Sequence, residues 1–199
     1  MFKDTYQSGI LSLFYSCGSK PLSLWSKTVK SGYVKRLTDE QIQSLVLEII
    51  GSNVISTYIS CPASEQMSLG IRLPYLNMLV KNLKKYFSFE VQILDDKDVT
   101  RRFRINNIQT FAKINPYICY LPLNLSPGWN HIQLNLAHYT KVSFNTCYVE
   151  TIRIAVYANC RLRRIYFADR VYPDDELPSE YKLFVKKKKK SITSQENTS

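Results

Sequence analysis

The chain of 199 residues carries a formal net charge of +11 at pH 7, and 45% of its residues are hydrophobic and 13% aromatic. This length is enough to bury a core without disulfides or a structural metal, and the composition excludes an intrinsically disordered chain. Fourteen tyrosines add to a high content of strand-forming residues, which predicts a mainly β fold.

The N-terminus and the cysteines indicate the cellular setting. The first residues include an early charge pair and lack the apolar core of a signal peptide, and no apolar run is long enough to span a bilayer. We therefore expect neither secretion by a signal peptide nor contact with a membrane. The cysteines are odd in number and form no CxxC pair, which indicates a reducing, cytosolic protein without a disulfide scaffold. They are Cys17, Cys61, Cys119, Cys147 and Cys160.

Apolar residues alternate with period two in many short segments, which predicts half-buried strands. Strands at this density, separated by clusters of Pro, Gly, Asn or Asp, are typical of a sandwich or barrel. The acidic turn formers of "LDDKDVTRRF" predict a hairpin loop between two of them. The predicted strands are 10–16, 44–50, 89–94, 100–105, 117–121, 130–136 and 150–158.

One segment departs from this alternation and predicts a helix over about 75–87. Its apolar residues recur at steps of three and four, and Pro74 lies where a helix can begin. The outer face of this helix would carry a solvated stripe of lysines. A second, short helix is expected over "AHYTKVSF", residues 137–144. The apolar residues of the first helix are Leu76, Leu79, Val80, Leu83 and Phe87, and its lysines are Lys81, Lys84 and Lys85.

The stretch "SPGWNHIQLNLAHY" poses the question of an active site, because a tryptophan, an asparagine and a histidine are adjacent in it. On the strand interpretation Pro127 and Gly128 form a turn, and the alternating Ile132 and Leu134 face the core. Trp129 and His131 then project from the other face, beside Gln133 and Asn135. A surface histidine is therefore favoured over a ligand or a general base.

No other pattern predicts chemistry. The six glycines form no phosphate-binding loop, and neither histidine has Cys, Asp or Glu at metal-ligand spacing. Cys160 precedes a basic run that could lower its pKa, but a small core residue is the favoured interpretation. The acidic clusters 95–98 and 174–176 are interpreted as solvated turns. We therefore expect no catalytic residue, no cofactor and no metal.

Two predicted strands are rich in arginine, and both are candidate partner contacts. Arginine pairs in bidentate fashion with carboxylates and phosphates, so two such strands on a solvated sheet would form a positive face. An ordinary solvated strand surface remains the alternative. In the second strand Ile165 and Phe167 are out of phase with Leu162, which predicts a bulge. The candidates are Arg101, Arg102 and Arg104, then Arg161, Arg163 and Arg164, together with Trp129 and His131.

The basic charge is concentrated at one end of the chain. Residues 186–199 carry five lysines and one glutamate, no aromatic residue and mostly polar side chains. This composition predicts a disordered tail behind a folded domain of residues 1–185. The domain itself is moderately basic, so an anionic partner is expected.

Several blocks of the sequence resemble the cilia- and flagella-associated protein 20 family. They are "FKDTYQSGILSLFYSCGSKPLSLW" (2–25), "IQSLVLEIIGSNVISTYISCP" (42–62), "LGIRLPYLNMLVKNLKKYFSFEVQILDDK" (69–97), "GWNHIQLNL" (128–136) and "YVETIRIAVYANCRLRRIYFADRVYPDDELPSEYKLF" (148–184). The chain departs from the family pattern at "AHYTKVSF", at Ser126–Pro127 and in the tail. These departures concern loops and partner contacts.

The resemblance implies a jelly-roll β-sandwich with one helix, similar in shape to carbohydrate-binding modules. It implies a non-enzymatic role at the inner junction of ciliary doublet microtubules, where the family bridges the A- and B-tubule walls beside the parkin co-regulated gene protein. The implied partners are α/β-tubulin and other inner-junction proteins, in the cytoskeleton of the axoneme; basal-body and nuclear locations are also associated with the family. Tubulin surfaces are acidic, which agrees with the basic charge.

Two other functions follow from single features. A carbohydrate-binding module would use exposed aromatic residues such as Trp129 and Tyr157, although the cysteines argue against an extracellular protein. A nucleic-acid binder would use the arginines of 161–164 with Tyr166 and Phe167, and it would have to show sequence or structure specificity beyond charge. Both are less favoured than the structural role.

Overall fold

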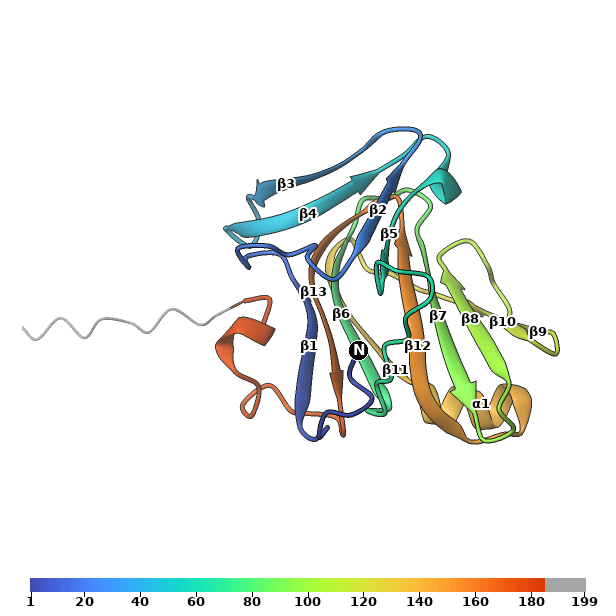
Figure 1. Cartoon of the computed structure of the whole chain (residues 1–199). Coiled ribbons are helices and arrows are strands. Elements are labelled where there is room, and N and C mark those ends of the chain that lie inside the picture. The colour runs from blue at the N-terminus through green and yellow to red at the C-terminus, as the bar shows by residue number, and fades with distance from the viewer. Residues whose placement is uncertain (185–199) are drawn as a thin grey trace, which may run out of the picture.

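Two β-sheets pack face to face in the computed structural model, which describes residues 1–184 (Figure 1). Both predictions of a mainly β fold and of a jelly-roll sandwich are confirmed. The predicted tail, residues 186–199, lies outside the described residues. No helix in the described part of the chain is both long and apolar enough to cross a membrane.

Sheet A has six strands in the order β11-β6-β13-β4-β3, with β1 paired to β13 beyond the end of β4. All of its pairs are antiparallel. Because β13 pairs with β6, β4 and β1, it is the central strand of the sheet. The strands are β1 (Ile10–Tyr15), β3 (Tyr33–Asp39), β4 (Ser44–Ile50), β6 (Tyr75–Asn82), β11 (Gly128–Asn135) and β13 (Cys160–Ala168).

Sheet B has seven strands in the order β2-β5-β12-β7-β8-β10-β9. Only β10 and β8 run parallel, because the chain returns along β9, the outermost strand, before it enters β10. The strands are β2 (Ser26–Val29), β5 (Thr57–Cys61), β7 (Ser88–Asp95), β8 (Thr100–Asn106), β9 (Lys113–Ile114), β10 (Ile118–Pro122) and β12 (Tyr148–Tyr157). Short 3-10 turns, η1 (Val54–Ser56) and η2 (Ser179–Tyr181), complete the described part.

The alternation seen in the sequence places one side of each strand in the core between the sheets. Val91 and Phe103 of sheet B are fully or almost fully buried there, as are Met78 and Phe167 of sheet A. All seven predicted strands are present, within one or two residues at their ends. The hairpin between β7 and β8 is also confirmed, with a four-residue connection over 96–99.

The helix predicted over about 75–87 is wrong, because residues 75–82 form β6 between β11 and β13. An inner strand of this sheet is covered on both faces: Leu76, Met78 and Val80 face the core, and Leu79 on the opposite face is only 2% exposed. Burial on both sides removes the period-two signal, so the apolar spacing resembled that of a helix. The chain then turns at Lys84, whose φ of 56° ends the strand.

The second helix prediction is confirmed by α1 (Leu136–Phe144). Asn135 caps its start, since its side chain accepts a hydrogen bond of 3.0 Å from the backbone N–H of His138. At its other end Asn145 adopts a left-handed conformation with φ 55°, which asparagine tolerates. The bulge predicted around 161–167 is also confirmed, because the register of β13 against β6 shifts between Leu162 and Arg164.

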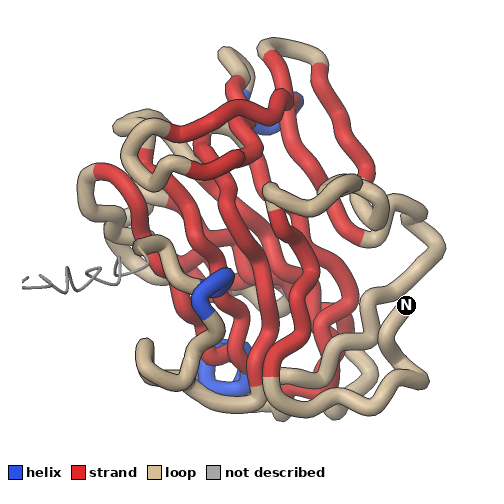
Figure 2. Tube along the Cα trace, turned by 90° about the vertical axis from the view of Figure 1, so that its left-hand side faces the viewer, coloured by secondary structure: helices blue, strands red, loops and turns tan. Residues whose placement is uncertain are grey.

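The C-terminal segment, residues 171–184, crosses the outer face of sheet A in front of its strands (Figure 2). Leu177 and Tyr181 from this segment bury Tyr166 of β13, and the three form a small cluster separate from the main core. Sheet A is therefore covered by sheet B on one face and, around Tyr166 and Leu79, by the chain's own end on the other.

The strand assignment of residues 75–82 can be tested at Met78. In a helix over these residues Met78 would lie on the face opposite the apolar residues, where it would be exposed. Because Met78 is fully buried, we expect Met78→Ala to lower the free energy of unfolding by about 2–5 kcal/mol in urea denaturation. The matched control is Met67→Ala at a side chain that is 48% exposed, and it should change stability by less than about 0.5 kcal/mol. Equal effects of the two substitutions would contradict the strand.

Candidate partner-binding surfaces

The two arginine-rich strands lie in different sheets, so the expected single positive face does not form. β8 belongs to sheet B and β13 to sheet A. Arg102 and Arg104 lie on the outer face of sheet B beside Gln92 and Glu90 of β7. Arg161 lies on the outer face of sheet A beside Lys81 of β6. The prediction of one shared face is wrong because the outer faces of a sandwich point in opposite directions.

A buried carboxylate on the outer side of sheet A holds the first of the β13 arginines. Asp39, at the end of β3, is fully buried, and its Oδ2 lies 2.7 Å from Arg161 Nη1 and 2.8 Å from Lys81 Nζ. Trp129 Nε1 donates to its Oδ1 at 3.1 Å. Burial alone would raise the pKa of Asp39, but these hydrogen bonds outweigh it and hold the pKa well below its usual range.

Arg161 also pairs with a second carboxylate, which leaves its guanidinium with two internal partners. Its Nε lies 2.6 Å from Glu48 Oε2, and Tyr33 donates to Glu48 Oε1 at 2.7 Å. Burial acts to raise the pKa of Glu48, and the bonds from Tyr33 and Arg161 lower it overall. A predicted partner contact is therefore an internal ion pair. No local pattern predicts this pairing, because Asp39 and Glu48 are far from Arg161 along the chain.

Trp129 is buried rather than exposed, which corrects the expectation for this residue. It projects from the outer face as predicted, but the tip of the β3–β4 hairpin covers it. The side chain of Gln41 at this tip lies close to Gly128, and a Cβ added to Gly128 would come within 3.3 Å of it. With 9% of its surface exposed and its Nε1 bound to Asp39, Trp129 offers no aromatic platform to a ligand.

Arg164 lies between two tyrosine rings beneath the C-terminal segment. Its guanidinium is 3.8 Å from the ring centre of Tyr181 and 4.2 Å from that of Tyr15, and the residue is only 4% exposed. It also lies 3.8 Å from the carboxylate of Glu180. Arg163 lies 4.8 Å from the ring centre of Tyr15 as well and stays partly exposed. Arg164 thus fastens the C-terminal segment to sheet A.

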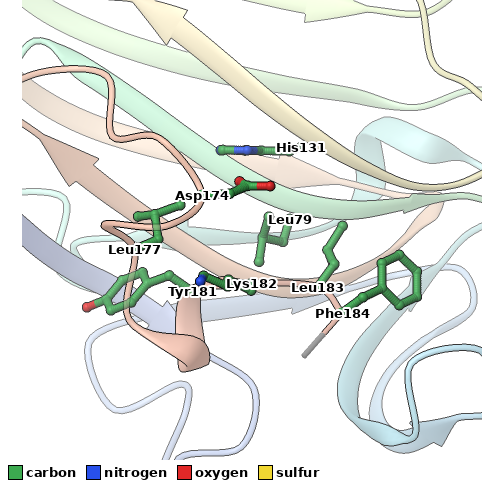
Figure 3. Close-up of a pocket in the computed structure, with 8 residues that line it drawn as sticks. All are labelled: Leu79, His131, Asp174, Leu177, Tyr181, Lys182, Leu183 and Phe184. Carbon is green, nitrogen blue, oxygen red and sulfur yellow. The ribbon is translucent and has the colours of Figure 1, made fainter. Parts of the chain in front are cut away.

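His131 is exposed, as predicted, at the rim of a pocket of about 260 Å³ under the C-terminal segment (Figure 3). Its Nε2 lies 2.9 Å from Asn77 Oδ1, and Gln133 donates to the same oxygen at 2.9 Å. Partial burial of the ring lowers the pKa of His131, and Asp174, which faces the ring across the pocket, acts in the opposite direction. The remaining lining is mostly apolar, with Leu79 as its floor and Phe184 at its edge.

The outer face of sheet B carries a polar groove of about 410 Å³ that includes Arg102 and Arg104. Its charges are largely paired with one another. Arg104 Nη2 lies 2.8 Å from Glu90 Oε2, and Arg153 donates to the carbonyls of Pro62 and Ser64 at 2.6 and 2.7 Å. Arg102 is the most exposed of these cations, with 53% of its side chain accessible and Glu90 4.0 Å away.

Arg101 does not belong to this groove, because alternation directs it to the inner side of β8. There its Nε lies 2.8 Å from the buried Asp95, and its guanidinium stacks on Phe144 of α1 at 5.0 Å. Asp95 also accepts bonds from the backbone N–H groups of Lys97 and Val99, which shape the β7–β8 turn. The acidic cluster 95–98 is thus a turn, as interpreted from the sequence.

The five cysteines differ in burial: Cys61, Cys119 and Cys160 are buried, Cys17 is partly exposed and Cys147 is exposed. All five cysteines are free, and burial raises the pKa of the fully buried Cys160 thiol, as expected of a core residue. Within residues 1–184 no three His, Cys, Asp or Glu side chains are grouped to hold a metal ion.

Comparison with known proteins decides the family. The CFA20 domain profile matches residues 1–185. The chain belongs to the CFA20 domain family. CFA20 relatives named cilia- and flagella-associated protein 20 include those of Chlamydomonas reinhardtii, at 57% identity, and Paramecium tetraurelia, at 55%. Each alignment spans 185 residues, 93% of this chain and 97% of the relative. The Caenorhabditis elegans relative is 56% identical over 93% of this chain and 91% of its own length.

Among solved structures, the CFA20 chain is similar to carbohydrate-binding modules at low sequence identity. The family 11 carbohydrate-binding module of the cellulase Lic26A-Cel5E of Clostridium thermocellum aligns with a TM-score of 0.44 and 11% identity, covering 85% of this chain and 99% of the module. The CBM22-1–GH10 modules of Clostridium thermocellum xylanase 10B align with a TM-score of 0.37 and 10% identity, over 84% of this chain and 29% of that one.

The ionised state of Asp39 gives a pH-dependent prediction. Because its pKa is depressed in the folded state, its stabilisation is complete above the unfolded pKa of about 3.9 and declines as the pH falls below that value. We expect Asp39→Asn to lower the free energy of unfolding by about 3 kcal/mol at pH 7. This difference should shrink by about 1 kcal/mol between pH 5 and pH 3. A difference that stays constant with pH would contradict an ionised Asp39.

Arg161 and Arg102 provide a matched pair for separating internal from surface arginines. Arg161→Glu would place a third carboxylate beside Asp39 and Glu48, so we expect a loss of about 3–5 kcal/mol in stability. Arg102→Glu alters a mostly exposed side chain and should cost about 1 kcal/mol or less. The free energy of unfolding of both variants is measured by urea denaturation at the same pH. Equal losses of stability in the two variants would refute the internal role of Arg161.

Proposed function

We propose that this chain is a non-enzymatic structural protein of the cilium that bridges the A- and B-tubules at the inner junction of doublet microtubules. Its role there is to support doublet stability and ciliary motility. The observation that carries the proposal is an identity of 55–57% across 93% of the chain with cilia- and flagella-associated protein 20 from an alga and a ciliate, two organisms that are widely separated. The expected location is the axoneme.

The charge of the chain supports acidic tubulin as the partner. The formal net charge is +11, and attraction between opposite charges raises the rate of encounter and selects against other basic surfaces. The parkin co-regulated gene protein and other inner-junction proteins are the proposed neighbours. A rigid sandwich suits this role, since a crosslinker must keep a fixed spacing between two walls under load.

Three of the four aromatic residues that suggested other functions are buried in the folded chain, and the fourth, Tyr157, is partly exposed at the polar groove of sheet B. Trp129, which motivated a carbohydrate-binding module, is buried against Asp39. Tyr166 and Phe167, which motivated nucleic-acid stacking, are 2% and 0% exposed. Phe167 lies in the core between the sheets, and Tyr166 is covered by Leu177 and Tyr181 of the C-terminal segment, so neither ring is available for stacking on a ligand.

Association with doublets tests the proposal directly. We expect the purified full chain to sediment with isolated ciliary doublets and with tubulin polymers at low ionic strength, and to dissociate as salt screens the charges. Deletion of the protein in a ciliated cell should leave gaps at the inner junction that cryo-tomography can resolve. Intact junctions in such cells, or no sedimentation at any salt concentration, would overturn the proposal.

A further inference from the structure

One edge of the sandwich carries unpaired positive charge. Residues 18–38 contain five basic side chains and no acidic one, and all five are exposed. Among residues 1–184 none of them forms an ion pair with a carboxylate, in contrast to Arg161, Arg101 and Arg104. These five residues, here named the basic edge, are Lys20, Lys27, Lys30, Lys35 and Arg36.

The basic edge follows the two strands that end the sheets: Lys27 lies on β2, Lys35 and Arg36 lie on β3, and Lys20 and Lys30 lie in the loop before β2 and the turn after it. β2 is the outermost strand of sheet B and pairs only with β5, and β3 is the outermost strand of sheet A and pairs only with β4. A short turn joins β2 to β3, so both free edges lie on the same side of the molecule (Figure 1). Lys27 pairs with the core residue Ile59 and Arg36 with Leu47, so both cations occupy inward register positions at the open side.

Charges at such positions keep edge strands from pairing with other chains, but the basic edge also surrounds a cavity. A groove of about 380 Å³ runs between β3 and the loop that contains Lys20. Its floor is apolar, formed by Leu22, Val34 and Leu47, whereas Lys20, Lys35 and Arg36 stand along its sides. Charges alone would protect the edge strands from pairing with other chains, so this role does not explain the apolar groove between the charges.

Two of the cations are already held in place. Arg36 Nη1 donates to the carbonyl of Gly18 at 2.8 Å, which ties β3 to the loop across the groove. Lys35 Nζ lies 4.3 Å from the ring centre of Tyr33. Ordered cations lose less side-chain entropy on binding than free ones, so they suit specific recognition of a carboxylate.

We propose that the basic edge is a docking site for an acidic peptide segment of a partner protein, with one apolar side chain of that segment in the groove. Charge complementarity decides the occupant: Lys20, Lys35 and Arg36 along an apolar floor, with Lys27 and Lys30 farther along the same edge, match carboxylates that flank an aliphatic or aromatic residue. This inference deepens the proposed function. It rests on the proposed function only for the identity of the partner, because tubulin and other proteins alike carry acidic segments.

The test uses the full chain and a fluorescein-labelled glutamate peptide with one central phenylalanine, followed by fluorescence anisotropy. We expect Lys20→Glu/Arg36→Glu to weaken binding about tenfold or more, because two contacts become repulsive. The matched control is Lys113→Glu/Lys141→Glu, which changes the net charge equally at exposed positions on β9 and α1, away from the basic edge. Circular dichroism checks that both variants are folded.

Two further probes distinguish attraction between charges from binding of an apolar side chain in the groove. Replacing the phenylalanine of the peptide by glycine should weaken binding several-fold if the groove takes an apolar side chain. Equal loss of peptide binding in the two double variants, or no effect of the phenylalanine, would overturn the docking site. Tighter binding of a labelled single-stranded oligonucleotide, lost in the same Lys20→Glu/Arg36→Glu variant, would also overturn it by assigning the surface to nucleic acid.

Sedimentation with tubulin polymers distinguishes this inference from the proposed function. If the wild-type chain binds the peptide but does not sediment with polymers, the partner is another acidic protein, so the proposed function fails and the docking site stands. If the Lys20→Glu/Arg36→Glu variant sediments like the wild type, the basic edge does not carry this contact and the inference falls while the proposed function stands.

Discussion

The buried carboxylate of Asp39 joins parts of the chain that the sheet hydrogen bonds alone would leave separate. It closes the β3–β4 hairpin over the outer face of sheet A by accepting bonds from Arg161 of the central strand, Lys81 of its neighbour and Trp129 of the far strand. An ionised group without solvent requires all of these partners, because any one left out would leave a charge or a polar atom unsatisfied. The position of the hairpin, the burial of Trp129 and the internal role of Arg161 all follow from this one group.

This arrangement divides the positive charge of the molecule into two classes. Arg161, Arg101 and Arg104 are held by Asp39, Glu48, Asp95 and Glu90, and Arg164 lies between two tyrosine rings under the C-terminal segment. Those cations maintain the fold and contribute little to the field outside it. The cations of the basic edge have no such partners among residues 1–184, and they surround a groove that the core does not use. The surface suited to an anionic partner is therefore the sandwich edge rather than a sheet face.

Local signals predicted much of the fold. Alternating segments predicted most of the strands but not β2, β3, β5 and β9. The acidic turn predicted the β7–β8 hairpin, and the phase change after Leu162 predicted the bulge in β13. The short helix after the "NL" strand was also predicted, and Asn135 and Asn145 cap it. The one misassigned element, β6, is buried on both faces, so its sequence lacks the polar half of the alternation. The outer face of β6 is covered by the C-terminal segment, which lies about a hundred residues away in the chain. A prediction from a short stretch of sequence cannot include so distant a segment.

The sequence by itself determined the sandwich, the family and the presence of two arginine-rich strands, because these depend on local periodicity and on the order of residues. Only the tertiary structure decided which charges are available to a partner. Asp39 and Arg161 are separated by 122 positions and meet at 2.7 Å, whereas Lys20 and Arg36 remain exposed beside one groove. An ion pair depends on distance in space and on exclusion of water, and neither quantity is written in the order of the residues.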